Sequence, residues 1–142
     1  MGRRASRELA MKLLYQLEMQ KENREEQIEQ FFTENTLAEK DKVYIDNVID
    51  GVYSNRKYIN SIIEFNSKDW KISRISKVDL SIMRLSIYEI CFRDDIPYSV
   101  SVNEAVELAK KYSSNDASSF VNGILSKVSK VKALPVEQSD GG

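Results

Sequence analysis

The sequence predicts an all-α protein, folded as a compact bundle of six or seven helices. Apolar residues recur at helical spacing along most of the chain, and strict polar–apolar alternation is almost absent. Only two prolines, Pro97 and Pro135, interrupt the 142 residues. This length suits one ordinary domain. We therefore expect a single helical domain over residues 1–132, followed by a polar tail at 133–142 that we expect to be disordered.

The first half of the chain predicts three helices. The first covers residues 4–20 and places four leucines and Ala10 on one face. The second covers residues 24–32, and Asn23 can cap its first turn. The third begins near Leu37 and continues to residue 65, with Gly51 indicating a close approach or a break. Its expected apolar side consists of Val43, Val48, Val52, Ile59, Ile62 and Ile63.

A turn at residues 66–69 leads into the second half, where residues 76–94 are apolar almost all the way round the helical wheel. Such a helix is usually buried on every side, so we expect it to be the central helix of the fold. Its polar residues Asp79, Arg84 and Glu89 then need partners on other helices. Arg84 and Glu89 are five residues apart and do not share a face, so we expect each to pair elsewhere. We interpret all three as structural anchors rather than catalytic groups.

Two further helices complete the bundle. Pro97 ends the central helix, and residues 101–104 (SVNE) have the pattern of a capping box that starts the next one. Asn115 or Asp116 is expected to cap the last helix. Gly123 inside it costs about 1 kcal/mol relative to alanine, so we expect a close helix contact there. The residues expected to face inward are Val121, Ile124, Leu125 and Val128.

The residue types that are missing argue against catalysis. The chain has no histidine and a single cysteine, Cys91, inside an apolar run. Nucleophile systems built on histidine and ordinary zinc sites are therefore not expected. Glycine-rich phosphate loops are also missing. We expect no enzymatic activity, no cofactor and no bound metal.

The N-terminus lacks the apolar block of a secretory signal, and no stretch approaches the ~20 apolar residues of a membrane helix. We expect a cytoplasmic protein. Its net charge of −1 hides an uneven distribution, because residues 1–21 carry five basic and two acidic side chains. Residues 22–50 carry nine acidic and three basic side chains. Any nucleic-acid site must therefore be a local basic patch, and we expect a second protein to assist it.

That patch is the start of the first helix, where Arg3, Arg4 and Arg7 cluster with Tyr15 further along. Arginine forks bind phosphates, and a tyrosine ring can stack on an unpaired base. From the residues alone, a solvated basic first turn explains the cluster equally well. Phe120, early in the last helix beside Asp116, is a second candidate, and core packing is its simpler explanation.

Five segments in order resemble the NusB family of bacterial antitermination factors. They are RRASRELAMKLLYQLE (3–18), DNVIDGV (46–52), W-x3-RISKVDLSIMRLSIYEI (70–90), IPYSVSVNEAVELAKKY (96–112) and FVNGILSKV (120–128). The resemblance implies an all-helical fold of two small packed subdomains, divided near residue 66, and no enzymatic activity. It implies binding to the boxA element of ribosomal-RNA leader transcripts as a heterodimer with the ribosomal protein NusE. That assembly joins RNA polymerase with NusA and NusG, so that the polymerase reads through terminators.

Carried over by position, the resemblance assigns RNA contacts to seven residues. They are Arg3, Arg4, Arg7, Tyr15, Asp79, Asp116 and Phe120. The arginines would lie along the RNA backbone, while Asp79 and Asp116 would accept hydrogen bonds from base amino groups. Two departures weaken the expected phosphate contacts: Ala5 and Ser6 interrupt the arginine run, and Ser119 stands where relatives can carry a basic residue.

Two other interpretations stay open. A helical protein–protein adaptor without an RNA site would use the acidic residues 22–50 to dock a basic protein. The adaptor differs from the RNA-binding interpretation in one testable respect: only RNA binding requires the face of Arg3, Arg4 and Arg7. A fragment of an RNA cytosine methyltransferase, which can carry a domain of this kind, would need a cofactor domain and a catalytic cysteine. The sequence offers only the helical domain and a Cys91 that we expect to be buried, so this interpretation holds only if the sequence is truncated. Self-association as a homodimer, the preferred RNA sequence and the partner interface are not fixed by the sequence.

Overall fold

The computed structural model describes residues 2–68 and 70–132, and within them it contains seven α-helices, one 3₁₀ turn and no strand. The all-α prediction is confirmed. The tail at 133–142 lies outside the described residues, so its disorder stays a prediction. The elements are α1 (Arg3–Met19), α2 (Arg24–Glu34), α3 (Glu39–Ser54), α4 (Arg56–Ser67), η1 (Ile72–Arg74), α5 (Lys77–Phe92), α6 (Tyr98–Tyr112) and α7 (Asn115–Lys132). None of these helices has the length and apolar character needed to cross a membrane.

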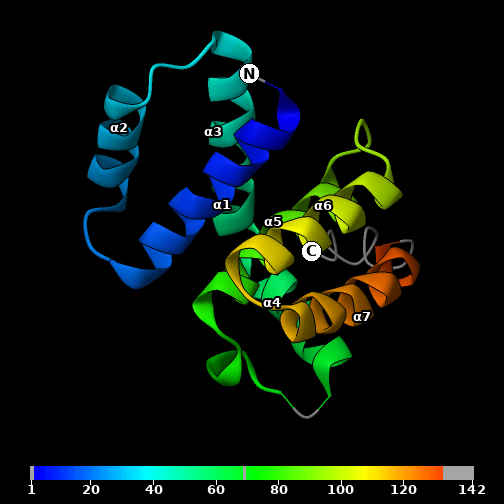
Figure 1. Cartoon of the computed structure of the whole chain (residues 1–142). Helices are drawn as coiled ribbons and strands as arrows, with labels where there is room; N and C mark the ends of the chain where they lie inside the picture. The colour runs from blue at the N-terminus through cyan, green and yellow to red at the C-terminus, as the bar shows by residue number, and fades with distance from the viewer. Residues whose placement is uncertain (1, 69, 133–142) are drawn as a thin grey trace, which may run out of the picture.

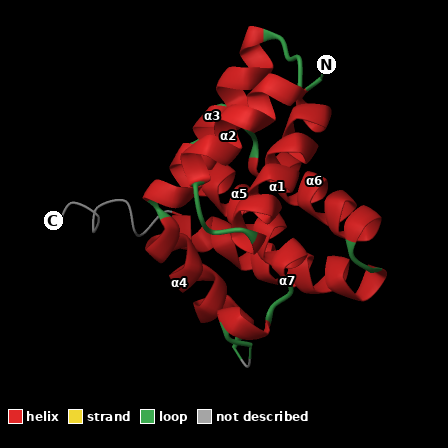
Figure 2. Ribbon diagram, turned by 90° about the vertical axis from the view of Figure 1, so that its left-hand side faces the viewer, coloured by secondary structure: helices red, strands yellow, loops and turns green. Residues whose placement is uncertain are grey.

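Helix α5 is the centre of the fold, as its apolar sequence predicts. It packs against α1, α3, α4, α6 and α7, and the view in Figure 1 shows it among them. Ser76 caps its start, because its hydroxyl accepts a hydrogen bond from the Asp79 backbone N–H at 3.1 Å. Helix α4 packs on α7 at one end of the bundle (Figure 2). Since α4 belongs to the first half of the sequence, the division near residue 66 stays a prediction.

Of the three polar residues of α5 expected to pair with other helices, Arg84 and Glu89 do so, whereas the Asp79 side chain has no such partner among the residues described. Arg84 donates to Glu18 of α1 and to Asn60 of α4, both at 3.0 Å. Burial alone would raise the pKa of Glu18, but Arg84, Lys77 and Arg56 together lower it below its usual value. Glu18 therefore stays ionised and ties α1 to the starts of α4 and α5. The anchoring role expected of Arg84 is confirmed.

The long third helix expected at residues 37–65 is two helices. Asn55 separates them: its side-chain amide donates to the Gly51 carbonyl at 2.8 Å and its backbone leaves the helical region. An asparagine that binds the carbonyl four residues back competes with the helix itself, which is a local effect that the apolar pattern does not show. Val43 was wrongly placed in the apolar side, since it is 57% exposed. The other five residues expected there are buried.

Three of the expected helix starts were wrong in detail. Asn23 precedes α2 but has a left-handed backbone (φ 56°) and makes no capping hydrogen bond with its side chain. Helix α6 begins directly after Pro97, whose fixed φ suits a helix start, so residues 101–104 lie inside the helix rather than capping it. Ser114, rather than Asn115 or Asp116, caps α7, because its hydroxyl accepts from the Ala117 backbone N–H at 2.9 Å.

The two glycines inside helices have opposite environments. A Cβ built on Gly51 would lie 2.1 Å from the ring of Tyr88, so the expected close approach is confirmed. Tyr88 is fixed there, because its ring stacks on Phe92 and its hydroxyl donates to Asn47 at 2.9 Å. A Cβ on Gly123 would meet nothing within 4 Å. The close contact expected at Gly123 was therefore wrong.

We predict that Gly51→Ala destabilises the protein and Gly123→Ala stabilises it. Overpacking at Gly51 must displace the Tyr88 ring, at a net loss of about 1–2 kcal/mol after the gain in helix propensity. Gly123→Ala adds a methyl group in open space and should gain up to ~1 kcal/mol. Urea denaturation followed by circular dichroism measures both. Equal stabilisation by the two substitutions would contradict the close contact at Gly51.

Candidate nucleic-acid interface

The arginine cluster lies at the start of α1, where Arg3 and Arg4 are both exposed. The Arg3 guanidinium lies 4.3 Å from the centre of the Tyr44 ring, a cation–π distance. The Arg4 fork binds both carboxylate oxygens of Glu104 on α6, with the shortest distance at 2.8 Å. Arg4 is nonetheless 76% exposed, so a phosphate can reach it in competition with Glu104.

Arg7 differs from its two neighbours because it is only 3% exposed. Its Nε donates to Glu89 of α5 at 3.0 Å, and Glu89 also accepts from the hydroxyls of Tyr44 and Ser101. Burial first, and the Glu89 carboxylate second, raise the pKa of Tyr44, so its hydroxyl stays protonated and donates. Arg7 thus holds α1 against the core, and the surface charge of this cluster comes from Arg3 and Arg4.

A second group of candidate residues meets at the starts of α5 and α7. There, a surface hollow of about 260 Å³ is lined by Trp70, Arg74, Ile75, Ser76, Asp79, Asp116, Ala117 and Phe120. The rings of Trp70 and Phe120 meet edge to face, with their centres 6.2 Å apart. Trp70 is 48% exposed and Phe120 is half-buried, so both rings present apolar surface in the hollow. The structure therefore brings Asp79, Asp116 and Phe120 together.

Asp79 has one carboxylate oxygen without a hydrogen-bond donor. The residue is only 8% exposed, and its Oδ1 accepts no hydrogen bond from any residue that the structure describes. A buried acceptor in this state costs about 1–3 kcal/mol. Because this atom is itself buried, a ligand N–H group could satisfy it only if the neighbouring side chains moved. Asp116, in the exposed first turn of α7, offers a second carboxylate at the same hollow.

Not every candidate joins these two groups. Tyr15 is half-buried on α1, eleven residues beyond Arg4, and does not line the hollow. Trp70 and Arg74 do line it, and neither was among the residues expected from the sequence. A single tryptophan beside a polar turn was the available signal for Trp70. No cluster of three or more metal-binding side chains occurs among the residues described.

The NusB family model matches residues 4–130, which is nearly the whole helical bundle. The chain belongs to the NusB family. One relative, the transcription antitermination protein NusB of Acetivibrio thermocellus, is 58% identical over 140 residues, covering 99% of this chain and 97% of that protein. The match to this relative therefore runs along nearly the whole length of both chains.

Solved NusB-family structures have the same fold. NusB of T. maritima superimposes with a TM-score of 0.85 at 35% identity, covering 92% of each chain. A second structure contains the antitermination factors NusB and NusE in complex with double-stranded RNA. Its matching chain has a TM-score of 0.81 and 29% identity, covering 91% of this chain and 96% of that one.

We predict that Glu89→Gln destabilises the protein by about 3 kcal/mol, because the buried Arg7 charge then keeps only its longer 3.9 Å contact with Glu104. Urea denaturation measures the loss. Glu107→Gln is the matched control: Glu107 is 61% exposed and lies 3.8 Å from Lys110, so its loss should cost less than ~0.5 kcal/mol. Similar stability of the two variants would show that the Arg7–Glu89 pair does not hold α1.

Proposed function

We propose that this protein is a transcription antitermination factor that binds boxA RNA of ribosomal-RNA leader transcripts. In this proposal it acts as a heterodimer with the ribosomal protein NusE, and the pair joins RNA polymerase together with NusA and NusG. Membership of the NusB family supports the antitermination role. The relative solved with NusE and RNA supports both binding partners.

The observation that carries the RNA-binding proposal is the hollow at the starts of α5 and α7. Trp70 and Phe120 offer aromatic surface on which an unpaired base can stack. The carboxylate of Asp79, which lines the hollow, can then accept a hydrogen bond from an amino group of that base. The hollow is lined by two carboxylates and one guanidinium, that of Arg74, and its aromatic rings suit a base rather than the RNA backbone. Stacking with edge recognition is the usual way proteins select single-stranded RNA.

Backbone contacts in this proposal come from Arg3 and Arg4. A phosphate that binds Arg4 must replace Glu104, so the net gain from this contact is smaller than that of an unpaired arginine. Arg7 acts as a positioning residue through Glu89. Weak electrostatic attraction of this kind explains why a basic partner such as NusE would be needed for tight binding.

The test is a fluorescence-anisotropy titration of a boxA-like single-stranded RNA, with and without the NusE-type protein. We expect sequence-selective binding that strengthens with the partner. A scrambled single strand and a duplex of the same sequence are the controls. The proposal would be overturned if the boxA-like strand bound no more tightly than the scrambled strand, both with and without the partner protein. Binding of the partner protein without RNA would then favour the helical adaptor, whose docking surface would be the acidic residues 22–50.

We predict that Phe120→Ala weakens RNA binding by about 1–3 kcal/mol, because it removes one stacking surface from the hollow. The same anisotropy titration measures this loss. Phe65→Ala is the matched control, since Phe65 is 77% exposed and does not line the hollow. Equal affinities of the two variants would remove Phe120 from the RNA site, provided that both remain folded by circular dichroism.

A further inference from the structure

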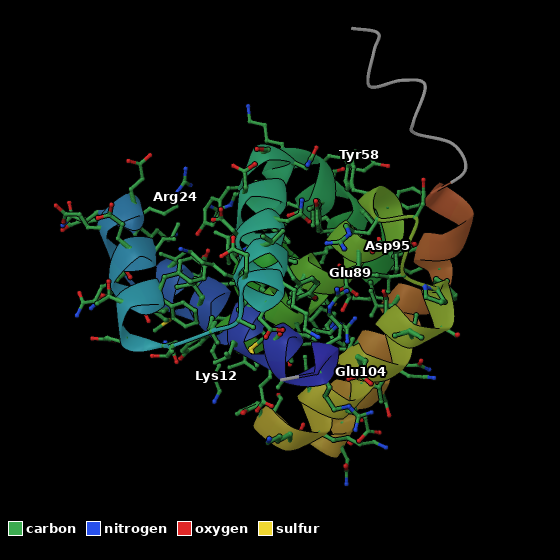
Figure 3. All side chains as sticks on the ribbon, turned by 90° about the horizontal axis from the view of Figure 1, so that it is seen from above. Lys12, Arg24, Tyr58, Glu89, Asp95 and Glu104 are labelled. Carbon is green, nitrogen blue, oxygen red and sulfur yellow. The ribbon has the colours of Figure 1, made fainter. Side chains whose placement is uncertain are left out.

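Helices α1 and α6 run in the same direction, and their side chains meet at successive levels. At the first level Arg4 binds Glu104 at 2.8 Å. At the second level Lys111 binds Glu8 at 2.9 Å, about one turn further along α1 and two turns further along α6. At the third level Lys12 lies against Tyr112. Figure 3 shows Lys12 and Glu104 on the same side of the molecule, away from Tyr58.

The third level combines two lysines with one aromatic ring. The ammonium groups of Lys12 and Lys111 each lie 5.4 Å from the centre of the Tyr112 ring. Such cation–π contacts hold a charge in place without neutralising it. Tyr112 itself is fixed, because its hydroxyl donates to Glu8. The ring thus positions two positive charges at the surface, where Lys111 is 61% exposed.

The charge balance at this point leaves one cation in excess. Glu8 is the carboxylate that contacts the group, and Lys111 neutralises it. Lys12 is exposed and has no carboxylate partner among the residues that the structure describes. An anion at this surface would therefore meet two ammonium groups. That of Lys12 has no carboxylate partner among the residues described, and that of Lys111 is paired with Glu8, which also accepts a hydrogen bond from Tyr112.

The lysine pair lies between the two groups of candidate RNA-binding residues. Along α1, Lys12 is eight residues beyond Arg4, which is about 12 Å along the helix. Along the chain, Tyr112 is four residues before Asp116, which is at most ~14 Å away. An RNA strand that reaches from the arginines to the hollow would therefore pass this pair.

We propose that Lys12 and Lys111, positioned by Tyr112, form a third RNA-contact point that binds backbone phosphates between the arginine cluster and the hollow. This inference rests on the proposed RNA-binding function. Phosphate is the expected ligand group because an exposed ammonium is a compact charge with three donors and reads no base edge at this position. The pair then contributes affinity and strand direction, while sequence selectivity comes from the hollow.

The test compares the salt dependence of RNA binding for Lys12→Gln/Lys111→Gln with that of Lys42→Gln/Lys57→Gln, a control with the same change in net charge on α3 and α4. The probe is the boxA-like single strand, measured by anisotropy at several salt concentrations. Each lost phosphate contact should lower the slope of log K against log[salt] by about 0.7, so the test variant should lose about 1.4. The control should keep the slope of the unmodified protein. All four lysines are exposed, so both variants should fold.

Three results would overturn the inference. If the test variant keeps its slope and affinity, the lysine pair contacts no phosphate, although the proposed function stands because the unmodified protein still binds. If the control loses as much, the effect is bulk charge. If the unmodified protein binds no RNA, the proposed function and this inference fail together. Tyr112→Leu should also lower the slope and Tyr112→Phe should restore it, since phenylalanine keeps the ring that positions the lysines.

Discussion

Glu89 lies fully buried near the middle of the bundle (Figure 3), and its carboxylate accepts hydrogen bonds from three different helices. Arg7 reaches it from α1, Tyr44 from α3 and Ser101 from α6. A buried carboxylate is tolerated only when its charge and its lone pairs are both satisfied. This one constraint fixes how α1 and α6 lie against α5. Together with the apolar contacts of α1 and α6, it determines which of their side chains face the surface.

The same constraint explains why a slightly acidic protein can carry a local basic strip. With Arg7 turned inward, α1 and α6 lie parallel and their facing side chains alternate in sign. Glu104 and Glu8 neutralise Arg4 and Lys111, while Arg3 and Lys12 rest on tyrosine rings without a carboxylate partner among the described residues. The strip therefore attracts an anionic strand weakly and at defined points. In the proposed function, such a surface would discriminate against bulk nucleic acid, whose binding depends on total charge.

The spacing of apolar residues in the sequence predicted which helices are buried. It did not predict which polar side chains pair with residues far away in the sequence. Helix α5 and the need for partners at Arg84 and Glu89 followed from an almost wholly apolar wheel. Ser101 and Glu104 match a capping box in sequence, yet both are bound by residues of α5 and α1, which no local pattern reveals. The hollow was predicted in part: Asp79, Asp116 and Phe120 do meet, but Trp70 joins them across a turn and was not expected. Arg7 was expected beside Arg4 at the surface, but its burial depends on Glu89, eighty-two residues away.

Acidic residues in an RNA site make physical sense only when phosphate and base contacts are separated in space. Asp79 and Asp116 line the hollow at the starts of α5 and α7, whereas Arg3, Arg4 and the lysine pair lie along α1 and α6. In the proposed function, a strand held by the basic strip enters the hollow with a base, because Trp70 and Phe120 offer it apolar surface there. In the proposed function, the carboxylate of Asp79 favours a base that carries an amino group. The proposal thus separates two roles: the strip would set where the strand lies, and the hollow would set which base it accepts.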